Sequence, residues 1–140
     1  MLMRICLILG FVFSLFSTAY AGSSPHEFML DNGLKLIVKK DTRAPVVVSQ
    51  VWYKVGSSYE YNGITGVSHV LEHMMFKGTE EYAPGEFSRI IAANGGRENA
   101  FTGRDYTAYF QQLEKSRLEI SFKMESDRMR GLLLPEEEFA

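Results

Sequence analysis

Residues 65–79 read TGVSHVLEHMMFKGT, and this stretch decides how the rest of the chain is interpreted. The pattern predicts a helix over residues 65–76, ended by Gly78 in the left-handed conformation that glycine adopts readily. At about 100° per residue, His73 lies about 40° from His69, and Glu72 lies about 60° away on the other side. One helix face therefore carries two imidazoles and a carboxylate. The apolar residues gather near the opposite side: Val67, Val70, Leu71 and Met74.

This arrangement favours a metal site of the kind that zinc proteases use. Histidines four residues apart, such as His69 and His73, are neighbours on a helix and can reach one ion. Zinc suits imidazole nitrogens and can keep one position open for water. The Glu72 carboxylate beside it would take the water's proton as general base and pass it to the leaving amine. This order of residues is the reverse of the better known His-Glu-x-x-His motif. The alternative is a pair of helix-surface histidines without a metal.

An Asn-Gly step near the start of the chain predicts a β-hairpin. Asn32-Gly33 supplies the positive φ that a tight turn needs, and extended runs flank it. β-branched and aromatic residues predict further strands. The run 46–55 is apolar on both sides for part of its length, which is typical of a buried strand. The expected strands span residues 27–30, 34–40, 46–55, 97–102 and 106–113.

Two further helices are expected after the motif. One opens at Pro84 and runs to about residue 93, and the other opens at Ser116, with Glu119 as its capping-box partner. Pro135 followed by three glutamates is typical of a helix start. The sequence therefore indicates the front part of a longer protein, and the alternative is a frayed polar tail. An apolar stripe on the second of these helices is expected to face the core: Leu118, Phe122, Met129, Leu132 and Leu133.

Residues 1–21 are expected to be a signal peptide rather than part of the fold. Arg4 precedes an apolar run over residues 5–16, and Ala19-x-Ala21 is the small-residue pattern that signal peptidase recognises. The run is shorter than the roughly 18 residues that span a bilayer. We therefore expect an exported protein, periplasmic or secreted, with no stable membrane span after cleavage. The alternative is an uncleaved N-terminal anchor. Cys6, the single cysteine, would leave with the signal peptide.

Composition excludes several classes of protein. There are 15 basic and 17 acidic residues, for a net charge of −2, which does not suggest a nucleic-acid partner. Hydrophobic residues make up 46% of the chain, as in a globular domain. The length allows one domain, over residues 22–140. Four other candidate ligands are interpreted as solvent-exposed, surface or strand-end groups: His26, Glu98, Asp105 and Glu114. Glu80 and Glu81 follow the motif helix, and no spacing argument makes either a metal ligand.

Beyond the motif, the sequence resembles the pitrilysin-type zinc peptidases, family M16. The family's signature runs almost unbroken through residues 66–79. The segment Asn99-Ala100-Phe101-Thr102, with Asp105, Thr107 and Tyr109, is similar to the next family block, and residues 125–129 resemble the stretch on the following helix. The resemblance extends from about Glu27 to Ala140. It implies an α+β fold, the M16-like α/β roll, in which a mostly antiparallel sheet packs on helices.

The resemblance also implies roles for individual residues. His69 and His73 would be zinc ligands, and Glu72 would be the general base. The strand containing Asn99, Ala100 and Phe101 would be the edge to which an extended peptide or unfolded protein substrate adds by main-chain hydrogen bonds. Arg128 would be structural and paired with carboxylates.

In one respect the chain departs from the family pattern. Members take a third zinc ligand from a Glu roughly 75 residues past the second His, and a catalytic zinc needs three protein ligands. That position would lie beyond Ala140, so we expect a peptidase domain that is incomplete at its C-terminus. A second, similar domain or subunit usually closes over the substrate. The alternatives are a non-catalytic M16-like subunit that binds peptides or a partner, and an unrelated secreted α+β module.

Overall fold

The structure, a computed structural model, describes residues 24–139. The expected signal peptide, residues 1–21, lies outside the described residues. The chain divides into two compact units, Met1–Ala44 and Pro45–Ala140, which are described separately. No helix within residues 24–139 is both long enough and apolar enough to cross a membrane.

The first unit contains the β-hairpin that the Asn-Gly step predicts. Strands β1 (His26–Met29) and β2 (Lys35–Val38) pair antiparallel. In the turn, Gly33 has a φ of 85°, a conformation that side chains with a Cβ rarely adopt. The Asn32 Oδ1 atom accepts a hydrogen bond from the Leu34 amide at 3.0 Å, which supports the turn. The hairpin prediction is confirmed, with β1 shifted by one residue and β2 shorter than expected.

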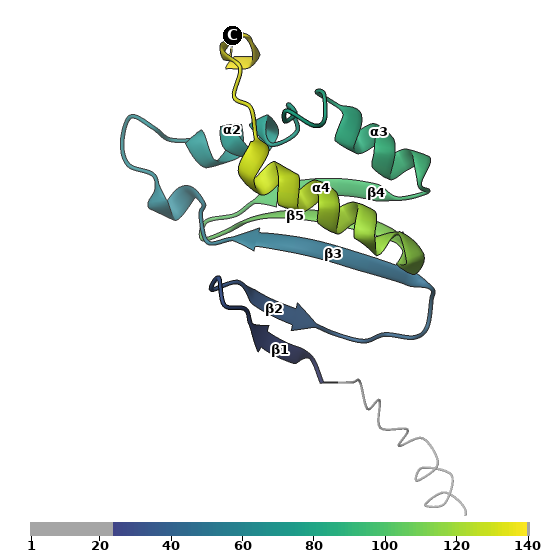
Figure 1. Ribbon diagram of the computed structural model, residues 1–140. Helices are drawn as coiled ribbons and strands as arrows, with labels where there is room; N and C mark the ends of the chain where they lie inside the picture. The colour runs from purple at the N-terminus through teal and green to yellow at the C-terminus, as the bar shows by residue number, and fades with distance from the viewer. Residues whose placement is uncertain (1–23, 140) are drawn as a thin grey trace, which may run out of the picture. The chain divides into compact units, whose positions relative to one another are not determined.

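The second unit is built on a three-stranded antiparallel sheet. Strands β3 (Val46–Tyr53), β4 (Arg97–Thr102) and β5 (Thr107–Glu114) are arranged in the order β3-β5-β4, so β5 is central (Figure 1). All three strands were expected. The interpretation of the β3 region as a buried strand is wrong for the described residues. Its side chains alternate between exposed and half-buried, because β3 lies at one edge of this sheet and only alternate residues face the helices.

Three helices lie over the sheet. They are α2 (Val67–Met74), α3 (Glu86–Ala93) and α4 (Leu118–Gly131), and Figure 1 shows α3 and α4 side by side over one face. Short 3₁₀ turns span Ser57–Tyr59, Lys115–Arg117 and Glu136–Phe139. The expected α+β architecture, an antiparallel sheet packed on helices, is confirmed. The apolar core lies between the sheet and the helices and contains Phe87, Ile91, Leu113 and Met124.

The start of α4 differs from the prediction. Ser116 does not cap the helix, because both its amide and its hydroxyl donate to the Glu114 carboxylate. These bonds organise the 3₁₀ turn Lys115–Arg117, and α4 begins after it with Arg117 as N-cap and no side-chain cap. The expected capping box of Ser116 with Glu119 is therefore wrong. The Ser116 side chain is bonded to Glu114, the last residue of β5, and so does not bond to the first turn of α4.

The buried face of α4 also differs from the predicted apolar stripe. Phe122 is 55% exposed and Met129 is 40% exposed, so the stripe does not form the core. Ser121, Met124, Glu125 and Arg128 are buried instead. Polar and charged side chains can occupy this face because each finds a partner inside the fold.

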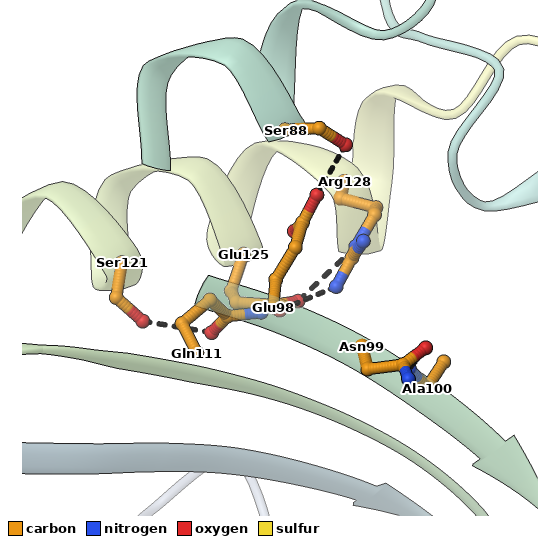
Figure 2. Close-up of polar contacts among 8 residues, drawn as sticks. All are labelled: Ser88, Glu98, Asn99, Ala100, Gln111, Ser121, Glu125 and Arg128. Carbon is orange, nitrogen blue, oxygen red and sulfur yellow. Dashed lines mark hydrogen bonds and ion pairs between the residues drawn. The ribbon is translucent and has the colours of Figure 1, made fainter. Parts of the chain in front are cut away.

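Those partners form a network between α4 and β5 (Figure 2). Arg128, 2% exposed, donates through Nη2 to Glu125 Oε1 and through Nε to Glu125 Oε2, the latter at 3.3 Å. Gln111 of β5 donates to the same Glu125 carboxylate and accepts from the Ser121 hydroxyl at 2.9 Å. This network confirms the expected structural role of Arg128, paired with a carboxylate.

Aromatic rings enclose the Arg128 guanidinium. Its central carbon lies 4.4 Å from the ring centroid of Phe87, 4.5 Å from that of Tyr109 and 5.3 Å from that of Phe76. These rings come from α3, β5 and the segment after α2. Cation–π attraction to desolvated rings therefore joins four parts of the unit at a single side chain.

Candidate metal centre and active site

Helix α2 brings the two predicted histidine ligands together. His69 and His73 are exposed, and their Nε2 atoms lie 3.2 Å apart. Their ring centroids are 4.7 Å apart with an interplanar angle of 67°. The expected spacing of four residues thus places two imidazole nitrogens side by side on the same helix face.

This separation fits a shared zinc ion. Zinc–nitrogen bonds of about 2.0–2.1 Å at a tetrahedral angle separate the two nitrogens by about 3.3 Å. Within residues 24–139, no group of three or more His, Cys, Asp or Glu side chains could hold a metal ion. The two imidazoles fit two positions of such a site, and Glu72 does not join them in a three-residue metal-binding group among the described residues. His26 is an exposed residue of β1, and neither Glu80 nor Glu81 belongs to a metal-binding group.

Glu72 points from α2 toward the sheet. Its carboxylate is half-buried, and its Oε2 atom accepts a hydrogen bond of 2.5 Å from the Thr102 hydroxyl at the end of β4. The structure shows no second hydrogen bond to this carboxylate from residues 24–139. Among the described residues, the carboxylate is therefore held through Oε2 alone.

The N-terminus of α2 is held by a residue that sequence reasoning missed. Glu60 accepts hydrogen bonds from the Gly66 amide at 2.7 Å and from the Ser68 amide at 2.9 Å. The N-cap Gly66 has no side chain, so Glu60 satisfies donors that the helix itself leaves free. These backbone hydrogen bonds lower the pKa of the Glu60 carboxyl below its ordinary value. The bonds reach six and eight residues along the chain, which local capping patterns do not cover.

The apolar side of α2 is largely open in this unit. Val67, Val70 and Leu71 are exposed, whereas Ser68 and Met74 are buried. Ser68 lies in the Glu60 cap, where its amide donates to the Glu60 carboxylate. The helix therefore packs through its two ends and the Glu72 side, and its apolar stripe remains accessible within the described residues.

Strand β4 carries the three residues expected to bind substrate. The strand lies at an edge of the sheet, next to β5, and among the described residues of this unit it has no strand partner on its other side. The Ala100 amide donates to its neighbour Asn99 Oδ1 at 2.9 Å. Phe101 contacts Trp52 and Tyr106, with ring centroids 5.6 Å and 6.0 Å away. The three residues thus lie on an edge strand that contacts α2, and Figure 2 shows Asn99 and Ala100 on this strand.

The Glu98 carboxylate, expected at the surface, is half-buried. Asp105 and Glu114 are exposed, but Glu98 is half-buried and accepts a hydrogen bond from the Ser88 hydroxyl of α3. Its other oxygen, Oε2, is buried and has no hydrogen-bond partner among the described residues. Burial raises the pKa of the Glu98 carboxyl. The surface interpretation was wrong because alternation along β4 turns residue 98 toward the helices (Figure 2).

Comparison with known proteins supports a protease class for this fold and site. The profile of the family described as Insulinase (Peptidase family M16) matches residues 35–140. A solved structure, "The crystal structure of a protease from Helicobacter pylori", superposes with a TM-score of 0.79 at 36% sequence identity. That match covers 83% of this chain and 28% of the other. The chain belongs to the peptidase M16 family, and the resemblance seen in the sequence is confirmed.

Curated relatives carry protease names. "Zinc protease PqqE" of Helicobacter pylori is 39% identical over 116 residues, covering 81% of this chain and 26% of that protein. "Probable mitochondrial-processing peptidase subunit beta, mitochondrial" of Arabidopsis thaliana is 30% identical over 102 residues, covering 73% of this chain and 19% of that protein. The chain thus spans about a quarter or less of the length of these relatives. The relatives' names imply a zinc-dependent peptidase family.

Proposed function

We propose that this chain supplies the metal-binding helix and the general base of a zinc-dependent metalloendopeptidase. The observation that carries the proposal is the pair of imidazole nitrogens 3.2 Å apart on α2, with a carboxylate one residue away. His69 and His73 hold the zinc ion through Nε2. The names of the curated zinc proteases support zinc as the metal.

The reaction is peptide-bond hydrolysis by water, without a covalent intermediate. When bound, zinc supplies Lewis-acid chemistry at the scissile carbonyl group. Glu72 accepts the proton of the attacking water through its unbonded oxygen and passes it to the leaving amine. His69 and His73 do not transfer a proton through Nε2, because each would use the lone pair of that nitrogen to bind the metal. A catalytic zinc requires a third protein ligand, and the described residues 24–139 contain no group of three candidate ligands.

Substrate binding is assigned to the open edge of β4. An edge strand offers unpaired main-chain groups, and an extended peptide pairs with them without regard to most of its side chains. Asn99, Ala100 and Phe101 lie on this edge, on the strand that also reaches Glu72. The proposed substrates are therefore extended peptides or unfolded proteins. A second M16-like domain or subunit would close over them, and residues 1–21 would direct the protein for export.

A non-catalytic M16-like subunit that binds peptides or a partner is the second candidate. The open edge of β4 supports it, because peptide pairing there requires no metal. Both candidate functions use the β4 edge to bind a peptide. They differ in whether Glu72 acts as the general base of a hydrolysis reaction.

The test uses the full-length protein, a fluorogenic peptide library and zinc measurement by mass spectrometry. We expect the Glu72→Gln variant to retain zinc and lose hydrolysis, and His69→Ala to lose both. His26→Ala is the matched control, because that histidine is exposed and lies outside the motif. A Glu72→Gln variant that still cleaves peptides, or wild-type protein without zinc, would contradict the proposal.

A further inference from the structure

A pair of threonines faces Glu72 at the end of the β4–β5 hairpin. Thr102 and Thr107 are directly opposite each other in the antiparallel register. Thr107 is buried and Thr102 is half-buried, on the side of the sheet that faces the helices. Their hydroxyl oxygens are 3.3 Å apart, and Thr102 Oγ1 is 2.5 Å from Glu72 Oε2.

The protons of these hydroxyls determine the direction of the hydrogen bonds. A threonine hydroxyl carries one proton, and an ionised carboxylate carries none, so Thr102 must donate to Glu72. Thr107 donates its one proton to the Val55 carbonyl oxygen at 2.9 Å, so neither hydroxyl has a proton left for the 3.3 Å contact between them. The Thr102 hydroxyl is therefore turned toward Glu72, and the Thr107 hydroxyl is turned toward Val55.

We propose that Thr102 is a positioning residue that orients the Glu72 carboxylate for its role as general base. The inference rests on the proposed function. A glutamate side chain has several rotatable bonds, so without a fixed partner it samples several rotamers. A charge-assisted hydrogen bond to one oxygen restricts that motion. The bond leaves Oε1 as the oxygen that receives the proton.

The location of Thr102 adds a second consequence. It is the last residue of β4, the strand proposed to pair with the substrate peptide. One strand therefore sets the position of the peptide main chain through its edge and the orientation of the base through its final side chain. A misplacement of about 1 Å in such a group can lower a rate by about a hundredfold.

The test compares Thr102→Val with Thr102→Ser in the full-length protein. Valine keeps the β-branched shape without the hydroxyl, whereas serine keeps the hydroxyl. We expect Thr102→Val to lower kcat by about 10- to 100-fold with KM and zinc content unchanged. Thr102→Ser should restore kcat to within about threefold of wild type, as expected if the hydroxyl and not the shape is responsible. Thr42→Val, at an exposed position in the loop after β2, serves as the matched control and should behave as wild type.

A second readout does not depend on activity. In the metal-free full-length protein, the melting temperatures of wild type, Glu72→Ala, Thr102→Val and the double variant form a double-mutant cycle. We expect Thr102→Val to lower the melting temperature less in the Glu72→Ala background than in wild type. Equal shifts in both backgrounds would show that the two side chains do not interact, and would overturn the inference.

The outcomes separate this inference from the proposed function. If wild type hydrolyses peptides and Glu72→Gln does not, while Thr102→Val keeps kcat within twofold, the positioning role is overturned and the proposed function stands. A Thr102→Ser variant as slow as Thr102→Val would also overturn the positioning role, because the hydroxyl would not be the cause. Wild-type protein that fails to hydrolyse peptides with zinc present would overturn both.

Discussion

Replacing Arg128 with methionine should destabilise the second unit more than any other single change on α4. Arg128 and Glu125 are 2% and 3% exposed, so the substitution leaves a buried carboxylate without its cation. Removing one partner of a buried ion pair costs about 3–5 kcal/mol. The guanidinium also lies within 4.5 Å of the ring centroids of Phe87 and Tyr109, and this attraction adds about 1–2 kcal/mol. The total is a large fraction of the 5–15 kcal/mol that stabilises a typical domain.

Hydrogen exchange in the full-length protein measures this loss locally. Since about 1.4 kcal/mol corresponds to a factor of ten, amides in β5 and α4 should exchange faster by about three to five powers of ten. Arg130→Met is the matched control, because Arg130 is an exposed arginine on the same helix. Its exchange should remain within about threefold of wild type, as is usual for surface substitutions.

A second substitution tests the cause of the effect. Glu125→Gln removes the buried charge and keeps an oxygen that can accept from Gln111, so it should relieve much of the defect in Arg128→Met. The coupling between the two sites should exceed about 2 kcal/mol in a double-mutant cycle. The reasoning fails if Arg128→Met accelerates exchange less than about tenfold, or if the two effects simply add.

Three further predictions concern the residues around the site. The lowered pKa of Glu60 means that its ionised form stabilises the fold above pH 4.5 and that this contribution disappears as pH falls through the folded pKa. Glu60→Gln should therefore lower the melting temperature at pH 7, and a deficit that persists at acid pH would contradict the capping role. The raised pKa of Glu98 has the opposite effect on the pH dependence of stability. The contribution of protonated Glu98 to stability is fully present below pH 4.5 and is lost as pH rises through the folded pKa. Glu98→Gln should then melt above wild type at pH 7 and equal it in acid; a lower melting temperature at pH 7 would show that burial is not the cause. Finally, a substrate peptide with alternate backbone amides N-methylated should lose at least about tenfold in affinity if it pairs with β4, and equal affinity would rule out main-chain pairing.

The parts of the fold that sequence reasoning predicted depend on local signals. The Asn32-Gly33 turn, the positions of the strands and the helix carrying His69 and His73 are each encoded within a few consecutive residues. The helical spacing alone was enough to place two imidazole nitrogens within reach of one ion. The family resemblance added the assignment of β4 as a sheet edge, and the strand order agrees with it.

The parts that were missed depend on partners far away in the sequence. The buried face of α4 is polar because Gln111 of β5 and the surrounding aromatic rings satisfy Glu125 and Arg128. An apolar periodicity on that helix could not reveal this. The contact between Thr102 and Glu72 joins residues 30 positions apart. It becomes visible only when the antiparallel register places the end of β4 beside α2.

The central claim is that His69 and His73 share a zinc ion. X-ray diffraction from crystals of the zinc-loaded full-length protein, collected on both sides of the zinc absorption edge, tests it most directly. The account predicts an anomalous peak about 2.0–2.1 Å from Nε2 of both histidines, with Glu72 beside the metal and not bound to it. A peak that misses either imidazole, or no peak near α2 at all, would contradict it.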